Sequence, residues 1–410
     1  MKSSLTKTAV AIVMFAFCAV GFAQEWNQFR GPNRDGRSSE TGLLKEWPEA
    51  GPKELWSYDK LGIGFSTPIV VKGTIYVAGI EGDEGLVYAL DTDGNFKWKK
   101  TYGPDANKKI GNGYAGTRTT PTYDNGKLYV MSALGVISCL SAETGDKIWS
   151  VDTFERFQGK NITWAIAESV LIDGDNVICT PGGKDASVVA LNKNTGKTVW
   201  TSKGLSDRSA YCSPIIIKRG SNRLLLTMLA KSVVAVNPDN GAKIWEFPHE
   251  VSYDINANTP LYYDGCIYYS NGYRHGGFMI ELSADGSSYD RKWTEKKMDV
   301  HHGNVVQLDG RIYGASSRNW MCLDFKTGAV IKEESGVGKG SVIYVDGMLY
   351  CYGERGNLGL AKITPDGFEF VSEFPITKGS NQHWAHPVVA NGRLLMRHGD
   401  VLMCFDIKAQ

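Results

Sequence analysis

The feature that most constrains this chain is an internal repeat. Laid against itself, the 410-residue sequence recurs every 37 to 53 residues, in eight copies. A repeat of this length indicates a supersecondary unit that buries its faces by stacking on its neighbours. The copies begin with a Thr-Pro pair or a relative of it, at Thr67-Pro68, Thr120-Pro121, Glu168-Ser169, Ser213-Pro214, Thr259-Pro260, Gly303-Asn304, Gly340-Ser341 and His386-Pro387.

Each copy carries the signals of four short strands. The first hairpin turn is often Asn-Gly or Asp-Gly, as at Asn125-Gly126, because both residues tolerate the positive φ of a tight turn. The third strand ends in a triplet such as Ala89-Leu90-Asp91, whose last residue suits the next turn. The second strands centre on Tyr76, Tyr129, Tyr268, Tyr313 and Tyr350. The fourth strands end in Trp98, Trp149, Trp200, Trp245 and Trp293, with Ile331 and Phe370 near that position in the sixth and seventh copies.

Four strands at this period predict an all-β, eight-bladed β-propeller in which each tryptophan docks against the next blade. The last copy ends shortly after Cys404-Phe405-Asp406 and lacks a fourth strand, whereas Leu55-Trp56-Ser57-Tyr58 resembles one. We predict that this N-terminal strand completes the eighth blade and closes the ring, which removes exposed sheet edges. The propeller then spans 55–410, and 24–54 is an extension packed on it.

Residues 1–23 are typical of a signal peptide. Lys2 and Lys7 precede an apolar run, and small residues flank Phe22 before Gln24, which predicts cleavage near Ala23 and a periplasmic or secreted protein. The run is too short to cross a bilayer, and no later run is long enough, so we expect no transmembrane segment. The 45 basic and 44 acidic residues nearly balance, which offers no electrostatic footprint for nucleic acid.

Seven cysteines follow the signal segment, and none forms a C-x-x-C pair, so zinc-finger and haem-attachment spacings are absent. Cys139, Cys322 and Cys404 fill the repeat position that is alanine in other copies, such as Ala89. We expect these cysteines to be small core residues rather than a disulfide framework.

The Ala-Leu-Asp, Thr-Gly and Trp pattern over residues 55–406 resembles the repeats of the PQQ-like (pyrroloquinoline-quinone-type) propeller family. That family includes quinoprotein dehydrogenases and their non-enzymatic relatives, such as the outer-membrane assembly factor BamB. Phe29-Arg30-Gly31-Pro32 also resembles a segment that opens exported members. The resemblance implies an eight-bladed propeller and an association with the outer membrane, but the same fold serves catalysis and scaffolding.

Propeller ligands bind at the mouth of the central channel, near the starts of the innermost strands. Adjacent strand residues face opposite sides, so only one of His301 and His302 is expected to point into the channel. A mixed metal site of His302 with His383 or His386 competes with the simpler interpretation of hydrogen-bonded wall histidines. Candidate ligand-binding residues at the mouth are Tyr211, His302, Lys339, His383 and Trp384, with His301 and His386 nearby.

The resemblance implies a quinone-dependent hypothesis in which pyrroloquinoline quinone and Ca²⁺ are cofactors. Glu168, Asn258 and Asp299 would hold the hard cation through oxygen atoms, and Asp299 would also be the catalytic base. Arg118 or Arg274 would bind a quinone carboxylate, and Trp164 would stack on the ring. The enzyme would be a dehydrogenase of an alcohol or a sugar, with the redox chemistry supplied by the cofactor.

The scaffold hypothesis requires less of the sequence. Loops on a rigid disc present an adaptable surface to a protein or glycan partner, and Trp164, Tyr211 and Trp384 suggest sugar binding. We therefore favour an exported binding or scaffold protein, with the quinone-dependent dehydrogenase as the alternative.

Overall fold

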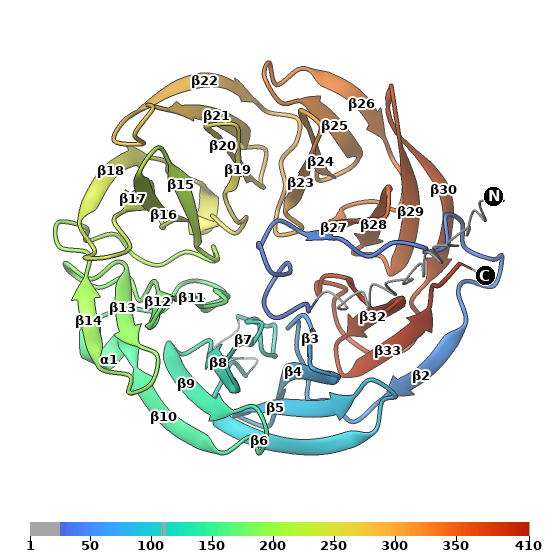
Figure 1. Ribbon diagram of the computed structural model, residues 1–410, viewed down its shortest axis with the longest axis horizontal. Coiled ribbons are helices and arrows are strands. Elements are labelled where there is room, and N and C mark those ends of the chain that lie inside the picture. Colours follow the sequence, from blue (N-terminus) through green and yellow to red (C-terminus); the bar gives the residue numbers. More distant parts are fainter. Residues whose placement is uncertain (1–24, 108, 110–111, 410) are drawn as a thin grey trace, which may run out of the picture.

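The eight repeats fold into eight antiparallel sheets of a ring, which confirms the predicted β-propeller (Figure 1). The computed structural model describes residues 25–107, 109 and 112–409, so the predicted signal segment lies outside the described residues. Within this part of the chain no helix is long and apolar enough to cross a membrane.

The blades follow one another along the chain. The first blade consists of β3 (Ile69–Val71), β4 (Thr74–Glu81), β5 (Glu84–Asp91) and β6 (Phe96–Pro104), and the second of β7 (Thr122–Asp124), β8 (Lys127–Met131), β9 (Val136–Ser141) and β10 (Lys147–Asp152). The third consists of β11 (Leu171–Asp173), β12 (Asn176–Cys179), β13 (Val189–Asn192) and β14 (Thr198–Thr201). The fourth consists of β15 (Ile215–Arg219), β16 (Asn222–Met228), β17 (Ser232–Val236) and β18 (Lys243–Pro248). A short helix α1 (Thr153–Phe157) and a 3₁₀ turn η1 (Ser252–Asp254) lie in the connections.

The remaining blades have the same order. The fifth blade consists of β19 (Leu261–Tyr263), β20 (Cys266–Asn271), β21 (Gly276–Leu282) and β22 (Tyr289–Glu295), and the sixth of β23 (Val305–Leu308), β24 (Arg311–Ala315), β25 (Trp320–Asp324) and β26 (Val330–Glu334). The seventh consists of β27 (Gly340–Val345), β28 (Met348–Gly353), β29 (Asn357–Thr364) and β30 (Gly367–Pro375). The eighth contains β31 (Val388–Ala390), β32 (Arg393–His398) and β33 (Val401–Asp406). β2 (Glu54–Tyr58) pairs antiparallel with β33 and completes the eighth blade, so the predicted ring closure is confirmed.

Tryptophans join neighbouring blades as the repeat predicted. The indole N–H of Trp149 donates to Lys193 O at 3.0 Å in the next blade, and Trp56 donates to Thr92 O at 3.0 Å across the closure. A Cβ added to the glycine beneath these rings would lie within 3.0 Å of the indole, so only glycine permits the contact. The glycines that lie against a tryptophan of the preceding blade are Gly94, Gly145, Gly196, Gly241 and Gly328.

Two blades lack this tryptophan. By strand register Lys332 takes its position in the sixth blade and Ser372 in the seventh, so Ile331 and Phe370 lie beside the position rather than in it. In the seventh blade the N-terminal extension brings Trp47, whose backbone N–H donates to Ser372 Oγ at 2.8 Å. Trp47 is buried and contacts Tyr350 edge-on at 5.5 Å between ring centres. Tyr76 and Trp98 make the equivalent pair within the first blade, at 5.9 Å.

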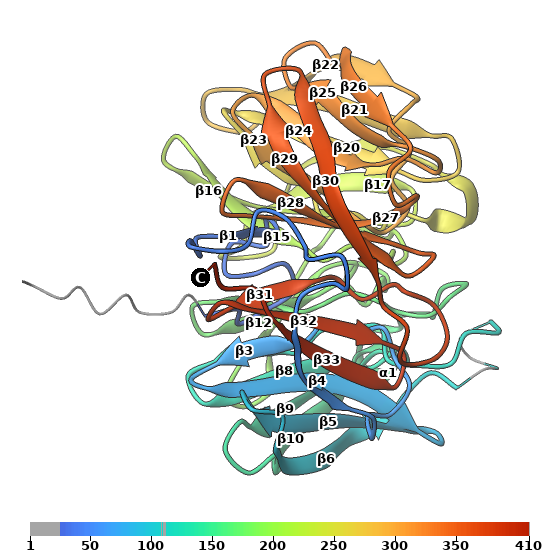
Figure 2. The ribbon, with the colours of Figure 1, turned by 90° about the vertical axis from the view of Figure 1, so that its right-hand side faces the viewer.

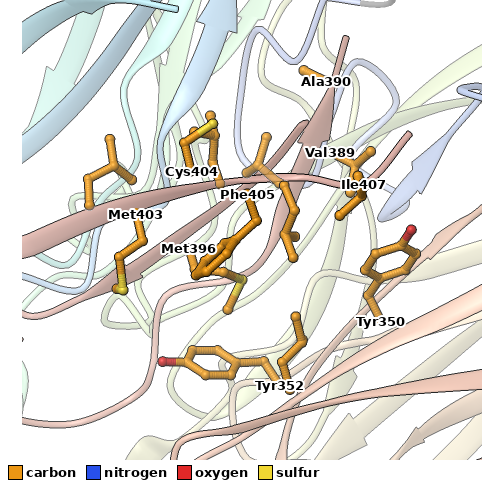
Figure 3. Close-up of a cluster of buried hydrophobic side chains, with 14 of the residues drawn as sticks. Tyr350, Tyr352, Val389, Ala390, Met396, Met403, Cys404, Phe405 and Ile407 are labelled. Carbon is orange, nitrogen blue, oxygen red and sulfur yellow. The ribbon is translucent and has the colours of Figure 1, made fainter. Parts of the chain in front are cut away.

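The core between the seventh and eighth blades is continuous. Tyr350 and Tyr352 of β28 lie beside Met396 and Phe405 of the eighth blade (Figure 3). The cysteines predicted to be core are free and buried in their blades, including Cys139, Cys322 and Cys404. Apolar contact between adjacent blades therefore provides the burial that a single blade cannot achieve.

The segment before β1 (Arg37–Ser38) crosses the centre of one face of the disc, and β1 pairs parallel with β27 (Figures 1 and 2). Two buried arginines anchor it. Arg30 donates to Val305 O at 2.6 Å, and Arg34 donates to Ser169 O at 2.9 Å and Pro214 O at 3.1 Å. These carbonyls belong to different blades, so the extension ties distant parts of the ring together. Burial lowers the pKa of each arginine to about 10, and both remain charged at neutral pH.

Candidate functional site

The central channel contains a cavity of about 520 Å³. Phe29 of the N-terminal extension contributes to one end of it and packs edge-on against His386 at 5.1 Å. The walls come from loops that lead into innermost strands and from the hairpins at β20–β21 and β28–β29. The lining residues are Phe29, Phe65, Thr67, Tyr114, Arg118, Thr120, Trp164, Ala167, Ser169, Tyr211, Ser213, Ile255, Ala257, Tyr273, His301, His302, Lys339, Glu354, Gln382, Trp384 and His386.

A belt of hydroxyl groups lines part of this cavity, from the eighth blade to the fourth. The backbone N–H of Thr67 donates to Thr120 Oγ1 at 3.1 Å, that of Thr120 to Ser169 Oγ at 2.9 Å, and that of Ser169 to Ser213 Oγ at 3.0 Å. The backbone N–H of His386 donates to Thr67 Oγ1 at 3.1 Å, so the belt crosses the ring closure. Four side chains near the starts of their repeats therefore link blades, because each satisfies a backbone donor of the preceding blade: Thr67, Thr120, Ser169 and Ser213.

Aromatic rings form two groups at the open end. Trp384 contacts Phe65 at 4.8 Å and Tyr114 at 5.1 Å between ring centres. On the other side, Tyr253 contacts Trp164 at 5.5 Å and Tyr273 at 5.5 Å. Both tryptophans are half-buried, which leaves part of each ring available to a ligand.

Six of the predicted site residues are brought together by the fold. Arg118, Trp164, Tyr211, His302, Lys339 and Trp384 all line the cavity. Tyr211 supports Trp164, since its hydroxyl accepts a hydrogen bond from the Trp164 backbone N–H at 3.2 Å. Burial raises the pKa of Tyr211 to about 12, so this hydroxyl stays protonated. The guanidinium of Arg118 donates to Gly116 O and Tyr114 O, both at 2.6 Å.

The histidines differ from the prediction. His301 and His302 both line the cavity, so the expectation that only one of them faces the channel is wrong. They lie in a bend before β23 and not on a strand, and strand alternation does not apply. His383 does not line the cavity; its Nδ1 lies 2.6 Å from the Tyr352 hydroxyl, and its ring stacks on His398 at 3.6 Å. Among the described residues no group of three His, Cys, Asp or Glu side chains is placed to hold a metal.

The proposed oxygen ligands of the quinone-dependent hypothesis are hydrogen-bonded to separate groups of the protein. Glu168 is fully buried behind the cavity wall, where its Oε2 accepts from the Thr180 backbone N–H at 2.9 Å. Asn258 donates to Ser270 O and Val300 O, both at 2.8 Å.

The third proposed ligand is also engaged within the protein. Asp299 accepts from the Ser317 backbone N–H at 2.8 Å and hydroxyl at 2.6 Å. Arg274 contributes its backbone N–H to Asp299 at 3.2 Å and does not line the cavity. A Ca²⁺ ion requires several oxygen atoms directed at one point. These residues therefore do not fit a Ca²⁺–quinone site.

Several functional residues were missed by sequence reasoning. Phe29, Phe65, Tyr114 and Glu354 line the cavity but were not predicted as ligand-binding residues. Glu354 lies in the hairpin between β28 and β29, which is the same hairpin of its blade as the one that carries Tyr273 in the fifth blade. This shared repeat position is the sequence signal that could have identified Glu354 as a cavity-lining residue.

The comparisons with known proteins agree with this architecture. The family model described as outer membrane protein assembly factor BamB matches residues 83–334, which is more than half of the chain. The structure of BamB from Moraxella catarrhalis is similar, with a TM-score of 0.62 and 17% identity over 87% of this chain and 98% of that one. The quinohemoprotein alcohol dehydrogenase from Comamonas testosteroni has a TM-score of 0.67 and 15% identity over 94% of this chain and 81% of the enzyme.

Several of the sequence relatives are quinone-dependent dehydrogenases. A quinoprotein ethanol dehydrogenase of Pseudomonas aeruginosa is 28% identical over 175 residues, which is 39% of this chain and 27% of the enzyme. The quinohemoprotein alcohol dehydrogenase ADH-IIG of Pseudomonas putida is 34% identical over 155 residues, which is 35% of this chain and 20% of the enzyme. The chain thus spans about a quarter of the length of these curated relatives. With the family match and the eight closed blades, the chain belongs to the PQQ-like β-propeller family.

Proposed function

We propose that this protein is an exported binding protein whose central cavity takes a glycan. The observation that carries this proposal is the cavity itself, in which two groups of aromatic rings face polar side chains. Sugar rings have an apolar face that packs on aromatic side chains and hydroxyl groups that require hydrogen-bonding partners. Arg118, Lys339 and Gln382 supply donors, and Glu354 supplies acceptors. The signal-like residues 1–23 support the export part of the proposal, which is a periplasmic or secreted location.

The test is isothermal titration with a panel of oligosaccharides, followed by variants of the aromatic groups. Trp384→Ala and Trp164→Ala are each expected to weaken binding at least tenfold, because each removes a stacking platform. Phe96→Ala is the matched control, since Phe96 is an exposed aromatic residue on β6 that does not line the cavity. Absence of heat with every oligosaccharide, or full affinity in both tryptophan variants, would exclude the glycan proposal.

Family membership favours a second candidate, a scaffold for a protein partner. BamB is described as an outer membrane protein assembly factor, and its structure has the same fold as this chain. In this proposal the loops around the cavity mouth, including the exposed Tyr253 and Tyr273, are the docking surface. The test is photo-cross-linking with a photoreactive residue in place of Tyr253, and with the same residue in place of Phe96 on an outer strand as the control. Capture of an outer-membrane protein at position 253 but not at position 96 would support the scaffold proposal.

A further inference from the structure

One side of the cavity is formed by three polar side chains that we call the polar wall: His302, Lys339 and Glu354. Glu354 is held between the other two. Its Oε1 lies 2.7 Å from His302 Nε2, and its Oε2 lies 2.9 Å from Lys339 Nζ. The Glu354 backbone N–H also donates to Lys339 O at 2.7 Å, which fixes the two loops relative to each other. The polar wall is therefore a preformed arrangement.

The charge state of the polar wall follows from these contacts. Burial raises the pKa of Glu354, but the hydrogen bonds and charges of His302 and Lys339 outweigh burial and lower this pKa to about 2. The carboxylate is therefore ionised at any physiological pH, and Lys339 neutralises it. Since Lys339 is already paired with Glu354 at 2.9 Å, its charge is not free for an anionic ligand.

His302 keeps one ring nitrogen for a ligand. Its Nε2 is engaged with Glu354 Oε1 at 2.7 Å, which leaves Nδ1 as the nitrogen that a ligand hydroxyl can reach. Within the described residues this Nδ1 atom has no hydrogen-bonding partner. The ring is fixed edge-on against Trp384 at 5.5 Å. A polar ring nitrogen thus lies beside the aromatic platform.

We propose that the polar wall is a subsite for two adjacent hydroxyl groups of a neutral sugar ring that rests on Trp384. One hydroxyl donates to Glu354 and accepts from Lys339, and its neighbour forms a hydrogen bond with His302 Nδ1, because a hydroxyl can both donate and accept. A uronic acid is disfavoured at this subsite, because its carboxylate would meet the ionised Glu354 while the Lys339 charge is already engaged. This inference rests on the proposed glycan binding and specifies the class of sugar.

The experiment compares a panel of neutral tetrasaccharides with an acidic one. Cellotetraose, mannotetraose and galactotetraose are titrated by calorimetry beside tetragalacturonate. We expect a neutral tetrasaccharide to bind at least tenfold more tightly than tetragalacturonate. Glu354→Gln and Lys339→Met should each weaken neutral-sugar binding tenfold to a hundredfold, since each removes a charge-assisted hydrogen bond.

The matched control is Glu369→Gln, which breaks the exposed ion pair of Glu369 with Lys362 (3.0 Å) on the outer part of the same blade. Its affinity should equal that of the wild type. Tighter binding of tetragalacturonate, or unchanged affinity in a folded Glu354→Gln or Lys339→Met variant, would overturn the polar-wall inference and leave glycan binding intact. No binding to any of the four sugars would overturn the inference together with the proposed function.

Discussion

Trp47 packs edge-on against Tyr350 with 5.5 Å between ring centres, close to the 5.9 Å that separates the tilted rings of Trp98 and Tyr76 in the first blade. Trp47 is not part of the seventh repeat, however, and its backbone donates to Ser372, 325 residues later in the sequence. The extension therefore supplies the aromatic residue that the seventh blade lacks. The propeller core and the extension are one cooperative unit at this point.

Trp47→Ala should consequently destabilise the whole propeller. Removing a buried aromatic side chain leaves a cavity and costs about 3–5 kcal/mol. The measurement is the free energy of unfolding by urea, with Phe96→Ala as the control because Phe96 is about half exposed at 49%. A loss below about 1 kcal/mol would mean that the seventh blade does not depend on the extension.

The hydroxyl belt gives a comparison between two equivalent threonines. Thr120 Oγ1 accepts from the Thr67 backbone N–H, whereas the buried Thr259 Oγ1 has no hydrogen-bonding partner among the residues that the structure describes. Thr120→Val keeps the shape but strands a buried donor, so it should cost about 1–3 kcal/mol. Thr259→Val should be neutral or stabilising in the same denaturation experiment. Equal effects of the two substitutions would contradict the role of the belt.

Glu168 should make stability depend on pH. Burial raises its pKa from 4.5 to about 7, although hydrogen bonds from Thr180 oppose the shift. The folded protein binds this proton more tightly than the unfolded chain, so its stabilising contribution is complete below pH 4.5 and is lost as pH rises through 7. The loss amounts to about 3 kcal/mol at 1.36 kcal/mol per pKa unit. Glu168→Gln should flatten the stability profile between pH 5 and 8, and the exposed Glu143→Gln should not.

The seven cysteines from Cys139 onward should differ in reactivity. Burial raises the pKa of each of them, and only the thiolate reacts with disulfide reagents. Six are buried and Cys266 is partly exposed. In the native protein from Gln24 onward, one thiol should react slowly with an aromatic disulfide, and Cys266→Ser should abolish that reaction. Rapid labelling of several thiols would show that the blades open readily.

Pyrroloquinoline quinone with Ca²⁺ should not change the melting temperature in a saturable way. Glu168, Asn258 and Asp299 already bond to separate groups of the protein. A thermal-shift titration with and without Ca²⁺ measures this directly. A Ca²⁺-dependent rise that disappears in Glu168→Gln would instead establish the quinone-dependent alternative.

The sequence predicted the blades well because their signals are local. Turn pairs such as Asn125-Gly126 and the strand-end tryptophans lie within a few residues of the structures that they specify. The site was harder to predict, because whether a residue near a strand start faces the cavity depends on the exact backbone path. Glu168 and Ser169 are neighbours, yet Ser169 lines the cavity and Glu168 is buried behind it. The role of Trp47 arises from a contact across most of the chain, which no local pattern encodes.

Closure of the ring by β2 and β33 also affects the timing of folding. These strands lie at opposite ends of the ring in sequence, so their pairing must wait until all the blades between them have been synthesised. Until then the first blade lacks the neighbour whose Trp56 docks on it, and the last blade has an open edge. Intermediate blades can stack earlier, but the barrier to completing the circle is a long loop closure. Once the ring is closed, neither the first nor the last blade can unfold without first breaking the pairing of β2 with β33. This requirement should slow unfolding relative to an open array of blades.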